Sequence, residues 1–231
     1  MEEKLINWFG PIWREALGDY LKSPEFLSIG RQITETRKTK VVYPESSKVF
    51  RCFKETSYDK VTVCLIAMDP YNTKNAADGL AFSCSGLLHP RPGLKNMLLE
   101  IESEYPQSYF DLTHFRIDLI DLTRWAKQNI LLLNAALTVE EGKAGSHSEI
   151  WKPFTIKVIE ALNKKENVVY LLLGKDAQSF EKYISTRHRI VSAPHPSAEA
   201  YSGGKAGFFG SNCFKQINEC LKDNNQIEII W

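Results

Sequence analysis

The sequence predicts an α/β fold in which a central four-stranded parallel sheet is flanked by helices. Four short apolar runs, rich in leucine and β-branched residues, occur at Val61–Ala67, Ile130–Leu133, Val168–Leu173 and Arg189–Ala193. Helix-like stretches separate the runs, and each run ends abruptly at polar or turn-forming residues. Such runs are typical of parallel strands that are buried on both faces.

The remaining elements follow from helical spacing and from breakers. Trp8, Trp13 and Leu17 fall near helical spacing, which predicts helical structure from Glu3 to about Lys38, broken at Gly10-Pro11 and at Ser23-Pro24. Val41–Glu45 follows as a short extended piece. Between and after the strands we expect helices over Leu94–Tyr105, Trp151–Asn163, Ala177–Ser185 and Phe214–Leu221.

Composition narrows the class of protein. The chain has 231 residues with 29 Lys plus Arg against 28 Asp plus Glu, so its net charge is +1, and 43% of its residues are hydrophobic. Few segments are polar enough to stay disordered, glycine and proline are not in excess, and no apolar run approaches the roughly 18 residues that cross a membrane. Disordered, fibrous and integral-membrane classes are therefore excluded, and no membrane partner is expected. No repeat or long linker divides the chain, and we expect one domain over residues 1–231 and a monomer. Because the net charge is close to zero, a surface that binds nucleic acid would need its positive charge concentrated in one place.

Cysteine usage and the N-terminus bear on the compartment. The five cysteines are an odd number without a Cys-x-x-Cys pair, and no Cys/His cluster has the spacing of zinc ligands. Acidic residues at Glu2 and Glu3 occupy the place where a signal peptide needs positive charge. We therefore expect an intracellular protein, cytoplasmic or, in a eukaryotic or viral setting, nuclear, with no signal peptide and no metal.

Polar side chains stand at the carboxyl ends of the predicted strands. Asp69 and Tyr71 follow the first strand, Asn134 follows the second, and His195 follows the fourth. Ligands of open α/β sheets bind in the crevice outside these strand ends. A carboxylate, a phenol, an amide and an imidazole are therefore predicted to converge on one site.

Each of these residues also has a structural reading. Asp69 precedes Pro70, and Asp-Pro is a common turn; at a strand end the carboxylate could instead orient a water or stabilise positive charge on a sugar. His195 stands between two prolines that restrict its backbone, and a ring held in one orientation could donate to an oxygen that gains negative charge. Asn134 could cap the next turn, or its amide could pair with an N–H beside a carbonyl, as in uracil.

A glycine-rich stretch, Gly203–Gly210, lies beyond His195. It fails the P-loop template because Lys205 is followed by Ala206 and position 199 is Glu. It is either a surface loop or a loop whose N–H groups and Lys205 reach a phosphate. We expect Phe208 and Phe209 to anchor it in the core.

The motifs together resemble the family 1 uracil-DNA glycosylases over essentially the whole chain. They run in the family's order, and each is weak alone: Asp69-Pro-Tyr, Gly79-Leu-Ala-Phe-Ser, the Pro90-Arg-Pro loop, Trp125-Ala-Lys-Gln, Leu132-Leu-Asn-Ala-Ala-Leu-Thr-Val, Ala144-Gly-Ser-His, His195-Pro-Ser and Gly207-Phe-Phe-Gly. The resemblance implies a uracil-DNA glycosylase fold and hydrolysis of the bond between uracil and deoxyribose in single- or double-stranded DNA, with no cofactor and with the target nucleotide flipped out of the helix.

The resemblance also implies roles for individual residues. Asp69 would position the attacking water, and His195 would bond uracil O2 as the base leaves. The uracil-binding residues implied are Met68, through its main chain, Tyr71, which excludes a C5 methyl, Phe82, which stacks on the ring, and Asn134, which reads N3–H and O4. The DNA-binding residues expected are Pro90, Pro92, Gly93, Lys175, Ser197, Tyr201 and Lys205. The DNA-facing surface would also suit a protein inhibitor that mimics DNA.

Four departures from the family pattern qualify these roles. Met68 and Asn72 stand where the family usually has Gln and His, and Asn72 beside the water site cannot carry a proton. Ala198–Tyr201 replaces the Pro-Leu that follows His-Pro-Ser, in a longer loop. Glu199 would be a poor wedge in a negatively charged helix, so Tyr201, or a residue displaced by the insertion, is expected to take the role of the family's leucine wedge. Lys175 stands where the family has a small polar residue, in the turn after the third predicted strand. The alternatives are a catalytically weakened uracil-DNA-binding protein and a glycosylase with an altered base range.

Overall fold

The computed structural model describes residues 8–107 and 117–231. The strands of its main sheet are β2 (Val63–Ala67), β3 (Ile130–Asn134), β5 (Val169–Leu173) and β6 (Arg189–Ala193). They are parallel and hydrogen-bonded in the order β3-β2-β5-β6. A separate antiparallel pair joins β1 (Val42–Tyr43) to β4 (Val139–Glu140). The predicted four-stranded parallel sheet is therefore confirmed.

Burial differs between β6 and the other three strands of the main sheet. Every residue of β2, β3 and β5 is buried, as expected for parallel strands covered on both faces. In β6, by contrast, Arg189 and Ser192 are exposed. The expectation that all four strands are buried on both faces is therefore wrong for β6. Its place at an edge of the sheet is not the cause, because β3 lies at the other edge and is fully buried.

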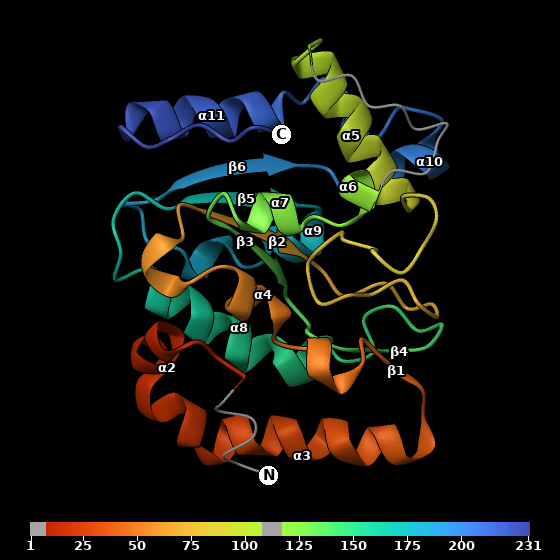
Figure 1. Ribbon diagram of the computed structural model, residues 1–231, viewed down its shortest axis with the longest axis vertical. Coiled ribbons are helices and arrows are strands. Elements are labelled where there is room, and N and C mark those ends of the chain that lie inside the picture. Colours follow the sequence, from red (N-terminus) through yellow and green to blue (C-terminus); the bar gives the residue numbers. More distant parts are fainter. Residues whose placement is uncertain (1–7, 108–116) are drawn as a thin grey trace.

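Helices cover both faces of the sheet (Figure 1). One side carries α2, α3, α4 and α8, and the other carries α5 and α11. The α-helices are α2 (Pro11–Leu17), α3 (Pro24–Thr39), α4 (Arg51–Glu55), α5 (Pro92–Glu104), α6 (Ile117–Ile120), α7 (Thr123–Ala126), α8 (Ser148–Leu162), α9 (Lys175–Gln178), α10 (Ala198–Ser202) and α11 (Cys213–Asp223). Short 3-10 helices occur at η1 (Gly18–Lys22), η2 (Ser46–Lys48), η3 (Tyr58–Lys60) and η4 (Glu181–Tyr183). None of the helices in the described ranges is long and apolar enough to cross a membrane.

Local chemistry explains where the first helices begin. Prolines occupy the first turns of α2 and α3, where a missing N–H costs nothing. The hydroxyl of Ser23 also caps α3 by accepting a hydrogen bond from the N–H of Phe26. Both predicted breaks, at Gly10-Pro11 and Ser23-Pro24, are thereby confirmed, whereas the start of the predicted segment at Glu3 lies outside the described residues.

The segment predicted as one helix over Ala177–Ser185 is wrong. It divides into α9, which ends at Gln178, and the separate 3-10 turn η4. The Ser179 hydroxyl donates to the carbonyl of Asp176, and such a local side-chain bond competes with continuation of a helix. The consequence is a short α9 that remains tied to the end of β5.

The carboxyl ends of the parallel strands point toward the long loops and α10 (Figure 1). The loop after β2 runs to α5, and the loop after β6 contains α10. Gly174, Asp69 and Asn134 lie at or just beyond the ends of β5, β2 and β3. The sheet therefore presents these residues at one edge, where the candidate site is found.

Candidate functional site

A cavity of about 240 Å³ opens at the carboxyl edge of the sheet. Its lining comes mainly from the loop after β2, with contributions from Ala144 and from the segment after β6. Seven residues predicted for the site line it: Met68, Asp69, Tyr71, Asn72, Phe82, His195 and Ser197. The convergence that the strand-end argument predicted is therefore present for Asp69, Tyr71 and His195.

Asp69 lies two residues beyond β2 and is held by one main-chain contact. Its Oδ2 accepts a hydrogen bond of 2.6 Å from the N–H of Gly145. Burial raises the pKa of the Asp69 carboxyl; the bond from Gly145 opposes that rise, and the nearby carboxylate of Asp176 adds to it. The carboxylate is thus an incompletely satisfied acceptor at the cavity, which suits it to hold a water or to face developing positive charge.

His195 is oriented by its neighbour in the chain. Its Nδ1 accepts a hydrogen bond of 3.2 Å from the N–H of Ser197, so the hydrogen of the neutral ring is on Nε2. Burial lowers the pKa of His195, and Asp176 only partly opposes this. The ring is therefore a neutral Nε2–H donor near neutral pH.

Glycine allows the end of β5 to approach this ring. Gly174 has a φ of +88°, and a Cβ at this position would lie 2.8 Å from the Cβ of His195. Any larger residue would move the histidine or the strand end. Gly174 therefore sets how closely the end of β5 can approach His195.

Phe82 and Tyr71 form a linked aromatic wall. Phe82 has a left-handed φ of +63°, which costs a non-glycine residue energy and occurs preferentially at functional sites. The Tyr71 hydroxyl donates a 3.0 Å hydrogen bond to the Phe82 carbonyl, and burial holds the pKa of Tyr71 well above its usual value. The Phe82 and His195 rings lie 5.6 Å apart between centroids, so the aromatic face and the imidazole border the same space.

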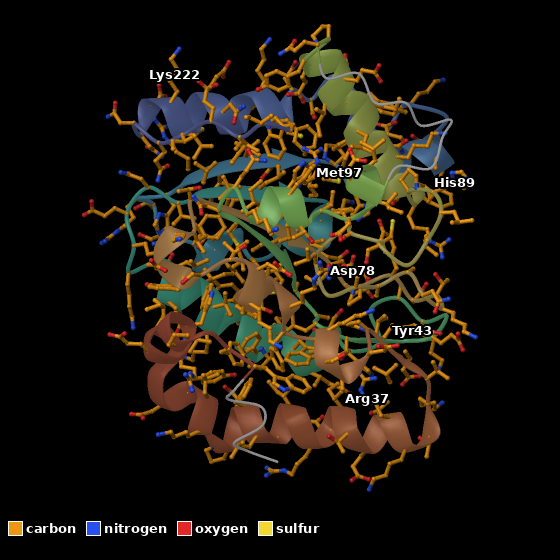
Figure 2. All side chains as sticks on the ribbon, viewed as in Figure 1. Arg37, Tyr43, Asp78, His89, Met97 and Lys222 are labelled. Atoms are coloured by element: carbon orange, nitrogen blue, oxygen red, sulfur yellow. The ribbon has the colours of Figure 1, made fainter. Side chains whose placement is uncertain are left out.

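Asp78 supports the Phe82 loop, and the sequence analysis missed it. Its buried carboxylate accepts hydrogen bonds from the N–H groups of Leu80 and Ser85 and from the hydroxyl of Ser83, and it lies 3.2 Å from a guanidinium nitrogen of Arg51. Asp78 lies inside the loops beyond the sheet (Figure 2). The only available signal was its position directly before the Gly79-Leu-Ala-Phe-Ser motif.

Asn134 does not line the cavity surface but lies directly beside it. It pairs in the sheet with Ala67, which does line the cavity, and only 4% of its surface is exposed. Its Oδ1 is buried and accepts no hydrogen bond from the described chain. An unsatisfied buried amide costs about 1–3 kcal/mol, which a ligand with a matching N–H recovers.

Met68 and Asn72, which stand where the family usually has Gln and His, both border the cavity. The Met68 side chain packs against Gly145, where a Cβ would lie 3.1 Å from the Met68 Cε. The Met68 carbonyl accepts from the N–H of Ala136, and that of Asn72 accepts from Gly142. Both residues are thus tied through their main chains into the loops beside Asp69.

Residues predicted to contact DNA lie outside the cavity, with Ser197 as the exception. Gly93 packs so closely on Ser197 that a Cβ would lie 2.8 Å from its Oγ, so the loop before α5 and the segment after β6 meet here. Lys175, Lys205 and Pro92 are exposed, and Pro90 is partly exposed. Tyr201 is 90% exposed on α10, and His89 reaches the edge of the molecule (Figure 2).

Two expectations about the glycine-rich stretch meet different outcomes. Phe208 is fully buried and anchors it, as predicted. Phe209 is 40% exposed, so its prediction as a core residue is wrong.

Within residues 8–107 and 117–231, no group of three His, Cys, Asp or Glu side chains is arranged to hold a metal ion.

Comparison with known proteins identifies the family. A model of the uracil DNA glycosylase superfamily matches residues 53–222, which include the whole cavity. The chain belongs to this superfamily. A uracil-DNA glycosylase of Actinobacillus succinogenes is 40% identical over 95% of this chain and 96% of its own, and one of Proteus mirabilis is 38% identical over 95% of both.

Solved structures of uracil-DNA glycosylases agree in fold. The crystal structure of the mimivirus enzyme superimposes with a TM-score of 0.85 at 20% identity, covering 98% of this chain and 88% of that one. A variant of the mimivirus enzyme in complex with UGI gives the same TM-score at 21% identity over 100% and 90% of the two chains. The predicted uracil-DNA glycosylase fold is therefore confirmed.

Proposed function

We propose that this chain flips deoxyuridine out of DNA and hydrolyses its N-glycosidic bond, releasing uracil and initiating base excision repair. The unpartnered, buried Oδ1 of Asn134 beside a cavity lined by Asp69, Phe82 and His195 carries the proposal. Membership of the uracil DNA glycosylase superfamily and the names of relatives about 40% identical support it.

Recognition of uracil follows from the groups around the cavity. Asn134 would accept from N3–H through Oδ1 and donate to O4, while Phe82 would stack on the ring. Cytosine presents an acceptor at N3 and a donor at N4, so it would leave the buried amide unpaired, a large penalty. Tyr71, fixed by its bond to Phe82, would exclude thymine by contact with the C5 methyl.

Two residues would then stabilise the charges that develop as the glycosidic bond breaks. The glycosidic electron pair leaves with uracil, and the negative charge gathers at O2, where the Nε2–H of His195 donates a hydrogen bond. Positive charge develops on the sugar and faces the Asp69 carboxylate. Water adds to C1′ and gives its proton to that carboxylate, so the step needs no metal or cofactor.

The DNA strand would be held by the rim of the cavity. The Pro90–Gly93 loop, Lys175, Ser197 and Lys205 would contact backbone phosphates, and Tyr201 would fill the gap left by the flipped base. We further propose that the protein acts as a monomer inside the cell on single- and double-stranded DNA. A variant of the mimivirus enzyme has been solved in complex with the inhibitor protein UGI, which supports binding of a DNA-mimicking protein inhibitor by this chain.

Single-turnover assays on oligonucleotides that carry one uracil, thymine or cytosine at the same position test the proposal. We expect rapid release of uracil and no measurable release of the other two bases. Tight binding of the uracil oligonucleotide without release would instead identify a catalytically weakened binding protein, with Met68 and Asn72 as the cause. Release of a C5-substituted uracil at a similar rate would identify an altered base range.

A further inference from the structure

The segment that follows His195 is built around one buried carboxylate. Glu199, in α10, is only 4% exposed although its neighbours Ala200 and Tyr201 are exposed. Its carboxylate accepts hydrogen bonds from the N–H groups of Ala206, Phe208 and Phe209. The side chain thus points inward, and the glycine-rich stretch folds over it.

Hydrogen bonding makes this buried carboxylate stable as an anion. Burial opposes ionisation of Glu199, but the bonds from Ala206, Phe209 and Phe208 outweigh it and hold the pKa of the carboxyl below its usual value. The hydroxyl of Ser202 approaches the same carboxylate and also accepts from the N–H of Lys205. The position of Lys205 is therefore set by the same cluster.

Helix α5 anchors both ends of the segment. At the near end, the side chain of Asn96 donates to the carbonyl of Pro196. At the far end, the buried carboxylate of Glu100 accepts from the N–H groups of Gly210 and Asn212. Figure 1 shows α10 beside α5. The segment from residue 196 to residue 212 is therefore fixed at its ends and at its centre.

Tyr201 is the large side chain that this arrangement leaves outside. It is 90% exposed on α10, two residues after Glu199 and so on the opposite side of the helix. An aromatic ring held out on a fixed support can stack where a base has been removed from a duplex. A single strand has no such gap between paired neighbours, so it gains less from the ring.

We propose that Glu199 is a positioning residue that holds Tyr201 and Lys205 in place to engage double-stranded DNA. This inference rests on the proposed function and adds to it a reason for activity on duplexes. Glu199 itself touches no substrate. It acts through the hydrogen bonds that shape the segment.

The test compares kcat/KM for uracil release from a duplex and from the matching single strand. In Glu199→Gln the side chain keeps its size, but one accepting oxygen is replaced by an NH2 group, which cannot accept hydrogen bonds from the main-chain N–H groups. We expect the duplex-to-single-strand ratio to fall about tenfold, the loss of one stacking contact. Glu219→Gln, the same change at an exposed position of α11, should keep the wild-type ratio.

Tyr201→Ala removes only an exposed side chain and keeps the test decisive even if Glu199→Gln folds poorly. It should lower the ratio by a similar factor, and Tyr201→Phe should restore it. Equal losses on both substrates in Glu199→Gln, or an unchanged ratio in Tyr201→Ala, would overturn the inference. If the wild type releases uracil from neither substrate, the proposed function fails instead.

Discussion

The cavity and the segment after it use polar side chains in opposite ways. Beside the cavity, the buried Oδ1 of Asn134 has no partner within the described chain, and in the cavity Asp69 accepts a single main-chain bond. The segment from 196 to 212, by contrast, donates five main-chain N–H groups to two carboxylates, its own Glu199 and Glu100 of α5. Unsatisfied groups mark where a ligand binds, and satisfied groups mark the support that shapes the surface.

The pKa values of Asp69 and Glu199 shift in opposite directions, because burial dominates at one and hydrogen bonding at the other. Burial dominates at Asp69 and raises its pKa, so ionised Asp69 destabilises the fold, and that cost appears as the pH rises through its pKa in the folded state. Hydrogen bonds dominate at Glu199 and lower its pKa. Its stabilisation is present above the pKa of the unfolded state and is lost as the pH falls through the folded value.

The largest effect is expected from Asp69→Asn. Uracil release should fall by roughly 10²–10⁴-fold, the range for loss of a positioned acid or base. The melting temperature at neutral pH should stay the same or rise, because the variant removes a costly buried charge. Single-turnover kinetics and thermal unfolding measure the two effects. A large fall in melting temperature would show that Asp69 supports the fold, as Glu199 does.

A smaller loss is expected from Gly174→Ala. The added Cβ would press on His195, and displacement of a catalytic group by about 1 Å can cost 10²-fold in rate. Gly18→Ala is the matched control, because Gly18 also has a positive φ but no atom lies within 4 Å of the added Cβ. Comparable loss of activity in both variants would assign the effect to backbone strain instead of the histidine.

Tyr71→Ala should change selectivity more than rate. Removing the ring opens space beside uracil C5 and removes the bond to the Phe82 carbonyl, so we expect thymine release to appear and uracil release to fall about tenfold. Tyr71→Phe keeps the steric block and loses only the hydrogen bond. Base release from thymine-containing oligonucleotides measures the change, and thymine release by the Phe variant would contradict the steric account.

The smallest effects are expected where the chain departs from the family pattern. Met68→Gln and Asn72→His should each change uracil release by less than about tenfold, since Asp69 and His195 retain the groups that stabilise charge. Parallel kinetics on the two variants and the wild type check this. A gain of 10²-fold or more would show that these positions impair the cavity.

The contrast between the two regions also explains what the sequence could predict. Apolar runs indicate buried strands, and motifs at their ends identify Asp69, Asn134 and His195, because substrate contact requires particular side chains at particular places. The supporting roles of Asp78, Glu100 and Glu199 had no such signal. A carboxylate that accepts main-chain N–H groups can pair with any residue type, so only the folded chain reveals its partners.

Measuring uracil release on duplex and single-stranded DNA for the wild type, Asp69→Asn and Glu199→Gln tests the division between cavity and segment most directly. We predict that Asp69→Asn lowers release from both substrates by the same large factor, so that their ratio is that of the wild type. Glu199→Gln should lower the duplex-to-single-strand ratio about tenfold. If Glu199→Gln leaves the ratio unchanged, or if Asp69→Asn retains wild-type activity, the account is contradicted.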